Sequence, residues 1–163
     1  MEFDSRTFRN ALGCFATGVA VITTQRQDGA PEGITVNSFS SLSLDPPLVM
    51  FSLDRKARCA DCFAGAEKYA VHILAIDQAE ISRTFATKGG PDWSGVRWQP
   101  GVTGCPIIAG ALATLECEVH ARHDGGDHVI MIGRVVQLQY ADGDPLLYFR
   151  GQYRRTEAVM ATP

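Results

Sequence analysis

The chain has 163 residues, of which 45% are hydrophobic, 20% charged and 9% aromatic. This length and composition exclude a disordered chain and favour one globular domain over residues 1–163, large enough to bury a core without disulfide or metal staples. The 15 Lys and Arg residues against 18 Asp and Glu give a net charge of −3, with the charges scattered singly. Because a nucleic-acid-binding domain normally carries a basic stripe, we expect no nucleic-acid partner.

Cysteine usage and the N-terminal residues bear on the compartment. The five cysteines are an odd number without the dense even spacing of a secreted disulfide scaffold. Glu2 and Asp4 balance Arg6 and Arg9, unlike the positive start of a secretory signal. The longest uncharged stretch, 98–115, contains prolines and glycines that disfavour a membrane-spanning helix. We therefore expect a soluble, cytoplasmic protein without a membrane partner.

The first half of the chain alternates short helices with strand-like runs. Phe8, Leu12 and Phe15 recur at helical spacing after a cap at Asp4 or Ser5, and Asp77 with Glu80 resembles a capping box for a later helix. The predicted elements are this opening helix, a strand over 17–24, a turn at 28–29, a returning strand over 33–40, a break at 45–47, a strand over 48–53, a helix over 57–66, a strand over 69–76 and a helix over 78–86.

The second half is dominated by strands. Residues 88–106 read as a long irregular loop, a kind of segment that is often functional in a small domain. Apolar and polar residues then alternate over 115–122, residues 123–127 turn the chain, and 128–138 return it, with Gly133 marking a bulge or a close backbone approach. A last strand covers 145–149. The hairpin succession predicts a mainly β (α+β) protein, an antiparallel β-barrel with peripheral helices.

Several catalytic motifs are missing from the sequence. It contains no Gly-x-Gly-x-x-Gly after a strand, no Gly-Lys-Ser/Thr loop, no His-Glu-x-x-His and no Gly-x-Ser-x-Gly. Classical dinucleotide folds, P-loop enzymes, zincins and α/β-hydrolases are thereby disfavoured. Cys59 and Cys62 form a lone Cys-x-x-Cys in a predicted helix, without a second pair at zinc spacing, so we expect them to be structural and predict no metal site.

Two neighbouring segments carry an unusual concentration of polar groups. In 35–43, hydroxyls and an amide alternate onto both faces of a predicted strand, which indicates either a solvent-exposed edge or the lining of a polar ligand. In 52–57, a serine and two cations follow an apolar strand and open the next predicted helix, an arrangement that suits a phosphate. An exposed charged turn is the other interpretation of 52–57.

These segments carry a family resemblance. The stretch from Thr35 to Leu48, TVNSFSSLSLDPPL, followed by SLDRKA from Ser52, resembles the signature of the short-chain flavin reductases, which are FMN-binding split barrels. The similarity continues through Gly125-Gly126-Asp127-His128 to the run that begins at Pro145, in the same order and spacing. The resemblance implies that nearly the whole chain is one flavin reductase-like FMN-binding domain.

The resemblance also implies which residues contact the flavin. In the family, a Thr-x-Asn-Ser segment runs beside the isoalloxazine ring and the ribityl chain, a Ser-x-Asp-x-Lys turn holds ribityl and phosphate, and the end of the second helix closes the site from the side. The residues at these positions are Thr35, Val36, Asn37, Ser38 and Ser41, then Ser52, Leu53, Arg55, Lys56 and Ala57, and finally Phe85 and Ala86.

A second set of residues is implied for the nicotinamide nucleotide. The family's Gly-Asp-His triplet is associated with its binding, and the C-terminal stretch resembles a nucleotide-contacting segment. The corresponding residues are Gly126, Asp127, His128, Arg150, Gly151 and Tyr153. Without the resemblance, His128 would be predicted to be a surface turn residue. His72 and His120 are predicted to have no part in the site.

The implied reaction is hydride transfer from NADH or NADPH to FMN, or alternatively FAD, with reduced flavin supplied to a partner flavin-dependent monooxygenase. The cofactors perform the chemistry, so no protein acid/base pair is needed, and His128 assists nicotinamide positioning. The resemblance further implies a weakly held flavin and a homodimer that closes the flavin cleft. Two alternatives stay open: a pyridoxamine-phosphate-oxidase-like flavoprotein and a non-catalytic flavin-binding module. The Gly-Asp-His triplet weighs against both.

Overall fold

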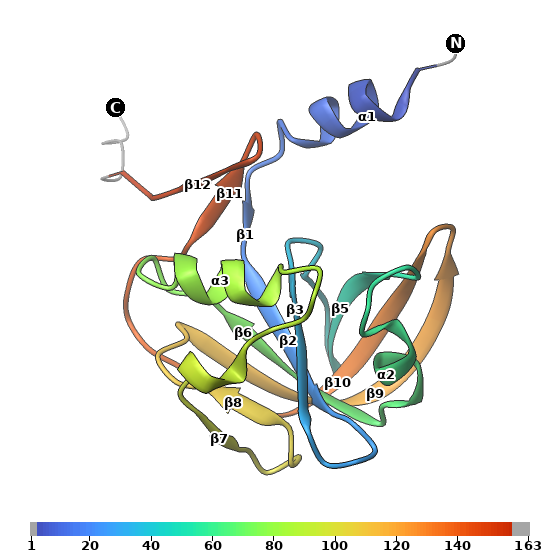
Figure 1. Ribbon diagram of the computed structural model, residues 1–163, viewed down its shortest axis with the longest axis vertical. Coiled ribbons are helices and arrows are strands. Elements are labelled where there is room, and N and C mark those ends of the chain that lie inside the picture. The colour runs from blue at the N-terminus through green and yellow to red at the C-terminus, as the bar shows by residue number, and fades with distance from the viewer. Residues whose placement is uncertain (1–2, 158–163) are drawn as a thin grey trace.

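The structure is a computed structural model that describes residues 3–157, so the predicted domain ends at residues 1 and 163 lie outside the described range. Strands predominate among the described residues, and the helices are short (Figure 1). In chain order the elements are α1 (Ser5–Leu12), β1 (Thr17–Gly18), β2 (Ala20–Gln25), β3 (Pro31–Val36), β4 (Ser40–Leu44), β5 (Pro47–Asp54), α2 (Ala60–Gly65), β6 (Lys68–Ile73), α3 (Ala79–Phe85), the 3-10 helix η1 (Trp93–Gly95), β7 (Trp98–Pro100), β8 (Pro106–Ile108), β9 (Ala113–Gly125), β10 (His128–Tyr140), β11 (Leu147–Phe149) and β12 (Gln152–Arg154).

Seven antiparallel strands form the main sheet, in the order β3-β2-β6-β9-β10-β5-β4. The sheet curves around a core, with α2 and α3 at its periphery (Figure 1). Strands β1, β11 and β12 form a second, smaller sheet, and β7 pairs with β8. The predicted antiparallel split β-barrel with peripheral helices is confirmed.

Strand β5 shows how sequence alternation divides the core from the site. Val49, Phe51 and Leu53 are buried in the main apolar cluster, where the Phe51 ring packs edge-on against Tyr69 with 5.2 Å between centroids. Because successive side chains of a strand point to opposite faces, Ser52 and Asp54 face away from this cluster. The same strand therefore supplies core residues and polar residues for the other face.

The predicted strand over 33–40 is wrong in its second half. Strand β3 ends at Val36, and β4 begins at Ser40 and pairs with β5 instead of β2. The reason is Ser38, whose hydroxyl donates to the Ser52 carbonyl (3.1 Å) and accepts from the Ser52 N–H (3.0 Å). These contacts draw residues 37–39 across to β5, so the polar segment 35–43 is divided between the β2–β3 and β4–β5 strand pairs.

Two predicted helices also differ from the structure. The helix predicted over 57–66 is α2 and begins only at Ala60, because residues 55–59 form turns after β5. The predicted Asp77 capping box is absent from α3, whose N-cap is Gln78. The Gln78 amide instead accepts from the Ala75 N–H (3.1 Å) and donates to the Ala109 carbonyl (3.0 Å), which ties this corner to the segment after β8.

The predicted irregular loop over 88–106 is more ordered than expected. It contains η1 and β7 and leads into β8, and Trp93 packs edge-on against Phe85 with 4.9 Å between ring centroids. The aromatic pair anchors this segment on α3. The segment is therefore a covering layer of the second apolar cluster, which includes Phe85 and Val96.

The β9–β10 pairing has a bulge beside Gly133, but the extra residue is His120 on β9. The β9–β10 register shifts between Ile132 and Gly133, and a Cβ at Gly133 would come within 2.5 Å of the Tyr69 ring carbon Cζ. The close backbone approach offered by the sequence is confirmed, because the Gly133 backbone lies against a buried side chain, whereas the bulged residue belongs to the facing strand.

Of the cysteine pair at α2, Cys59 caps the start of the helix and is buried, and Cys62 within the helix is partly buried. Cys59 is buried in the main cluster, and its burial raises the pKa of the thiol to about 11, while burial also raises the pKa of Cys62. A thiol with a raised pKa is a poor nucleophile and a poor metal ligand at neutral pH. This placement supports the structural interpretation of the pair.

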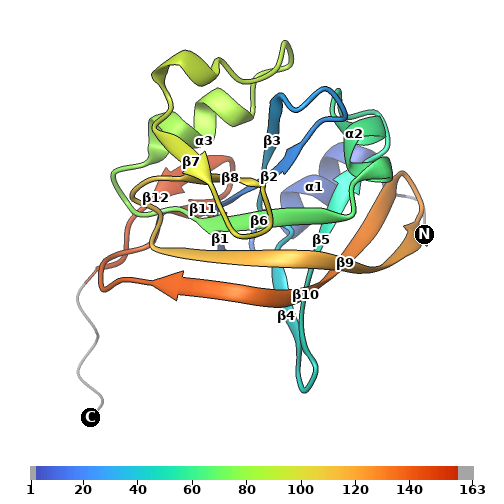
Figure 2. The same ribbon diagram turned by 90° about the horizontal axis from the view of Figure 1, so that it is seen from below.

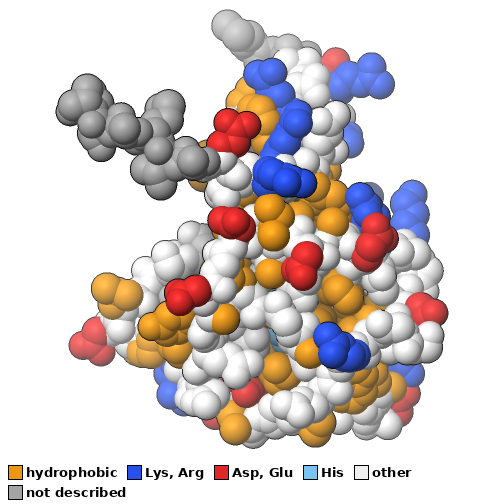
Figure 3. All heavy atoms as spheres, turned by 90° about the vertical axis from the view of Figure 1, so that its left-hand side faces the viewer, with side chains coloured by type: hydrophobic (Ala, Val, Ile, Leu, Met, Phe, Trp, Pro, Cys, Tyr) orange, Lys and Arg blue, Asp and Glu red, His pale blue; other side chains and the backbone are white. Residues whose placement is uncertain are grey.

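Three parts of the chain extend from the barrel. Helix α1 and the β11–β12 hairpin project at one end (Figure 1), and the β4–β5 hairpin protrudes in a perpendicular view (Figure 2). None of the eight residues of α1 is buried. Lys and Arg side chains gather on the narrow end of the molecule (Figure 3), where α1 carries Arg6 and Arg9 and the hairpin carries Arg150 and Arg154. Across residues 3–157, none of the helices has the length and apolar character needed to cross a membrane.

Candidate active site

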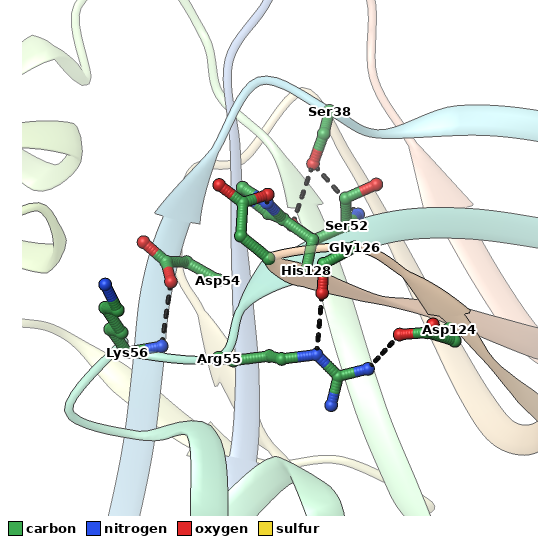
Figure 4. A network of polar contacts seen from close by, with 9 residues as sticks. Ser38, Ser52, Asp54, Arg55, Lys56, Asp124, Gly126 and His128 are labelled. Atoms are coloured by element: carbon green, nitrogen blue, oxygen red, sulfur yellow. Dashed lines mark hydrogen bonds and ion pairs between the residues drawn. The ribbon is translucent and has the colours of Figure 1, made fainter.

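The β5–β10 pairing brings the two predicted binding segments together. In the antiparallel register His128 lies opposite Asp54 and Ile130 lies opposite Ser52. Residues 52–56, from the predicted flavin turn, therefore lie beside the Gly126-Asp127-His128 triplet, although about 70 residues separate them in the chain. Figure 4 shows these side chains around the shared end of the two strands.

The turn after β5 is stabilised by Asp54. One Asp54 carboxylate oxygen accepts from the Lys56 N–H (2.7 Å), and the Asp54 carbonyl accepts from the Ala57 N–H (2.9 Å). The prediction that 52–57 opens a helix with free N–H groups is therefore wrong: a turn stabilised by its own aspartate occupies two of these donors. The Lys56 side chain is exposed on this turn.

Arg55 extends from the same turn to the β9–β10 hairpin. Its Nε–H donates to the Gly126 carbonyl (3.0 Å), its Nη2 pairs with Asp124, and its backbone N–H donates to the Asp127 carbonyl (3.0 Å) (Figure 4). The guanidinium predicted to contact the flavin is thus engaged with the hairpin.

His128 begins β10 at the hairpin end, with its side chain 40% exposed. Its Nδ1 lies 2.7 Å from an Asp127 carboxylate oxygen, and the hydrogen bond from His128 lowers the pKa of Asp127 below its usual value. The interaction fixes Nδ1 and leaves Nε2 as the ring nitrogen available to a ligand. A partly exposed imidazole oriented by a neighbouring carboxylate is suited to polar recognition.

Two adjoining hollows are lined by eight of the eighteen predicted residues. The larger, of about 1090 Å³, is bordered by Asn37 and His128 from the barrel and by Arg150 and Gly151 from the β11–β12 turn. The smaller, of about 220 Å³, is lined by Thr35, Val36, Asn37, Ala86 and Tyr153, among others. Asn37 and Tyr148 border both hollows. The structure therefore brings the predicted flavin residues of β3 next to the predicted nicotinamide residues.

Other predicted residues lie outside these hollows. Phe85 and Leu53 are buried in the two apolar clusters, so their side chains are not available to a ligand. Ser41 lies on β4, opposite Val49 of β5. Ser52 and Lys56 lie at the end of β5 and in the turn after it, beyond the hollows. The Thr35 hydroxyl donates to the Ser82 carbonyl (2.7 Å) and so holds β3 to α3.

Tyr148, Arg9 and Thr17 are among the residues at the hollows that were not predicted from the sequence. Tyr148 stacks edge-on with Tyr153 at 5.7 Å between ring centroids, and Arg9 and Thr17 border the larger hollow. Tyr148 and Arg9 belong to stretches that share the family pattern, but only the fold brings them to Asn37. The hydroxyl of Thr17 is buried without a hydrogen-bond partner among the described residues.

The chemistry of this donor set fits a flavin nucleotide. The amide of Asn37 and the hydroxyl of Thr17 suit the polar edge of an isoalloxazine ring, and the aromatic face of Tyr148 suits its apolar part. Ser52 and Lys56 present a hydroxyl and an ammonium group at the next turn, which suit the ribityl hydroxyls and the phosphate. Among residues 3–157, no cluster of His, Cys, Asp and Glu side chains has metal-binding geometry.

Comparisons with known proteins identify the family of the chain. The family model described as "Flavin reductase like domain" matches residues 12–157. The chain is 44% identical to the FMN reductase (NADH) SmoA of Agrobacterium fabrum, covering 93% of this chain and 86% of that protein. It is 39% identical to HsaB, the reductase subunit of a flavin-dependent monooxygenase of Mycobacterium tuberculosis, over 99% of this chain and 88% of HsaB.

A solved structure shows the same fold. The NADH:FAD oxidoreductase SgcE6 of Streptomyces globisporus, in complex with NAD and FAD fragments, matches with a TM-score of 0.90 at 34% identity, covering 97% of this chain and 98% of that one. The resemblance found in residues 35–57 is thereby confirmed, and the chain belongs to the flavin reductase like domain family.

Proposed function

We propose that this chain is an NADH-dependent flavin reductase that transfers a hydride from the nicotinamide to FMN. The observation that carries the proposal is the hollow in which Asn37, from the flavin segment, and His128, from the Gly-Asp-His hairpin, border one space. Two stacked ring systems require such a shared space. Relatives of 39–44% identity that carry flavin-reductase names support the same activity.

The flavin side of the site is formed by β3 and the turn after β5. Thr35, Val36, Asn37 and Ser38 hold the ring edge and ribityl chain, while Ser52, Lys56 and the Ala57 backbone hold the ribityl and phosphate groups. Ser38 acts through the backbone of β5, to which it is bonded. Leu53 and Phe85 contribute through the main chain and through packing, since both are buried. Ala86 closes the smaller hollow from α3.

The nicotinamide side is formed by the β9–β10 and β11–β12 hairpins. His128, whose Nδ1 is held by Asp127, presents Nε2 as the acceptor of a hydrogen bond from the amide of the nicotinamide carboxamide. Arg150, with Arg9 across the same hollow, supplies positive charge for the diphosphate. Gly151, at φ 77°, allows the tight turn that positions Arg150. Tyr153 supports this hairpin by donating its hydroxyl to Ser82 (2.8 Å).

The bound flavin and nicotinamide supply the redox chemistry, in which a hydride passes from one ring to the other. The protein residues orient the two rings, exclude water and stabilise negative charge with N–H and hydroxyl donors. No described side chain needs to gain or lose a proton for this step. FMN and NADH are proposed because SmoA carries both in its name, and FAD is the alternative because SgcE6 was solved with FAD fragments.

We further propose that reduced flavin passes to a partner monooxygenase and that the protein acts as a cytoplasmic homodimer. HsaB is named as a reductase subunit, which supports the first point. The apolar residues Leu12 and Phe15 of the larger hollow's rim are 57% and 76% exposed, which supports burial by a second copy. All five cysteines are free thiols, as expected for a reducing compartment.

Turnover of NADH with free FMN tests the proposal. The purified protein is mixed with both, and loss of nicotinamide absorbance is followed. Multiple turnovers per protein chain are expected. Tightly bound yellow flavin without NADH oxidation would instead indicate a pyridoxamine-phosphate-oxidase-like enzyme or a flavin-binding module.

A further inference from the structure

Arg55 joins two segments that the proposed function assigns to different ligands. It belongs to the turn after β5, on the flavin side, yet its side chain contacts the β9–β10 hairpin, on the nicotinamide side. The guanidinium donates to the Gly126 carbonyl (3.0 Å) and pairs with the Asp124 carboxylate, one residue on either side of Gly125. A planar guanidinium can make both contacts at once, which a single ammonium group does less well.

Apart from the strand pairing and the bonds from Arg122 to the Phe63 and Ala66 carbonyls, the described side-chain contact that holds the hairpin tip to another element is that of Arg55. Residues 122–127 are all exposed, and the two-residue turn at Gly126-Asp127 has a positive φ of 77° at Gly126. Exposed hairpin tips with little packing are the parts of a fold that open most easily. His128 follows directly and depends on the tip for its orientation, because its Nδ1 is bonded to Asp127 (2.7 Å).

We propose that Arg55 is a positioning residue that holds the Gly-Asp-His hairpin against the flavin turn and thereby aims His128 at the nicotinamide. The engaged side chain is not a ligand of the flavin phosphate, which leaves Lys56 as the cation of this turn for that purpose. The kinetic part of this inference rests on the proposed reductase function, and its structural part does not.

The solvent exposure of the Arg55–Asp124 ion pair limits how much the loss of Arg55 should change KM for NADH. The Arg55 side chain is 46% exposed and Asp124 is 80% exposed, so the ion pair is screened by solvent and salt. Losing the guanidinium leaves the backbone bond from the Arg55 N–H to the Asp127 carbonyl in place. We therefore expect Arg55→Met to raise KM for NADH by about 3- to 10-fold rather than to abolish turnover.

The structural test uses amide hydrogen exchange on flavin-free protein. Arg55→Met is expected to speed exchange of the amides of residues 125–129 at least about threefold. Arg134→Met is the matched control. Arg134 on β10 pairs with Glu118 on β9 (2.5 Å), within the same hairpin but away from its tip, and its side chain is about as exposed as that of Arg55. Unchanged exchange at 125–129 in Arg55→Met, or an equal change in Arg134→Met, would overturn the positioning role.

The kinetic test separates positioning from phosphate binding. Flavin affinity is measured by fluorescence for FMN and for riboflavin, which lacks the phosphate, alongside KM for NADH. Arg55→Met should raise KM for NADH and keep the FMN-over-riboflavin preference, Arg55→Lys should recover part of the loss, and Lys56→Met should reduce the preference. If Arg55→Met abolishes the preference and leaves KM for NADH unchanged, Arg55 is a phosphate ligand and the inference is wrong.

Failure of the inference and failure of the proposed function give different results. A wild-type protein without NADH turnover contradicts the reductase function, whatever the variants do. In that case the exchange experiment on residues 125–129 still decides whether Arg55 holds the hairpin. A wild-type reductase whose Arg55→Met variant matches it in exchange and in KM contradicts the inference alone.

Discussion

Single side chains at the β5–β10 end divide between building the site and facing a ligand. The Ser38 hydroxyl is hydrogen-bonded to the β5 backbone, and the Arg55 guanidinium is bonded to the Gly126 carbonyl and to Asp124. In His128, by contrast, one ring nitrogen contacts Asp127 and the other is available to a ligand. Residue type alone does not separate these cases, because a serine, an arginine and a histidine in this family pattern all resemble ligand contacts. The hydrogen-bond partners separate them.

His128→Ala is expected to raise KM for NADH about tenfold, the loss of one charge-assisted or polar contact, with less than a twofold change in flavin affinity. The reason is that His128 lies on the hairpin side of the hollow, opposite Asn37. Steady-state kinetics at saturating flavin, with fluorescence titration of FMN, provides both values. An unchanged KM for NADH would remove His128 from the site, and His123→Ala, an exposed residue earlier in the same hairpin, is the control.

At the scale of the element, the strands are held in place by a few buried polar and close-packed contacts. His72 of β6 is fully buried, with its Nδ1 3.1 Å from the Val21 carbonyl of β2 and its Nε2 accepting from the Ile108 N–H (3.1 Å) of β8. It therefore links three strands as a neutral imidazole. The sequence prediction that His72 takes no part in the site agrees with this position.

The burial of His72 predicts a pH-dependent stability. Burial lowers its pKa to about 4, against opposing effects of the bond to Val21 and of Glu116, whereas the unfolded chain has the ordinary value of 6.5. Between these pH values the unfolded state binds a proton that the folded state does not. The contribution of His72 to the free energy of unfolding, up to about 3 kcal/mol, is therefore complete above pH 6.5 and is lost as the pH falls toward 4.

Urea unfolding at pH 7.5 and pH 5 measures the effect. His72→Gln should lower stability at pH 7.5 and flatten the decline toward pH 5, while His120→Gln, at an exposed position, should retain the wild-type decline. An identical pH profile in His72→Gln and wild type would exclude His72 as the source.

The contact between β10 and β6 at Gly133 makes a second prediction at this scale. A Cβ at this position meets the buried Tyr69 ring and lies 2.9 Å from the Cys117 Cβ, so Gly133→Ala should destabilise the fold by about 1–3 kcal/mol through overpacking. Tyr69→Phe removes a buried hydroxyl that has no partner among the described residues, and it should relieve part of that loss. Thermal unfolding of the single and double variants checks this, and strict additivity would contradict a shared contact.

At the scale of the whole molecule, helix α1 projects from the barrel, and none of its residues is buried within the single chain. Its last residues and the segment that follows form one rim of the larger hollow, and Phe8 and Leu12 of the helix and Phe15 just after it are 49%, 57% and 76% exposed. A cluster of exposed apolar side chains of this kind is typical of an interface. A second copy of the chain that covers this cluster would also narrow the opening of the hollow.

We expect Phe15→Ser to shift the protein from dimer toward monomer and to weaken flavin affinity in parallel. Val102→Ser, at an isolated position that is 74% exposed, is the control and should leave both unchanged. Sedimentation equilibrium over a range of concentrations gives the masses. A wild-type protein that remains monomeric throughout would contradict the homodimer.

The sequence predicted the barrel and most strands correctly, because the apolar run over 48–53 is typical of a buried strand and the alternation over 115–122 directly reflects two faces of a sheet. It failed over 33–40 because Ser38 bonds to β5, a contact between distant segments that no local pattern encodes. For the site, the family pattern located Asn37 and His128, but it did not find Tyr148 and Thr17, or the bonds that engage Arg55. Those depend on how β1, β11 and the hairpins meet in three dimensions.

A crystal structure of the protein with FMN tests the central claim most directly, namely that the end of β3 and the turn after β5 together hold the flavin. The account predicts the ring beside residues 35–38 and the phosphate against Ser52 and Lys56, with His128 facing the exposed side of the ring. Flavin bound elsewhere, such as in the groove near Arg26 and Lys68, would contradict it.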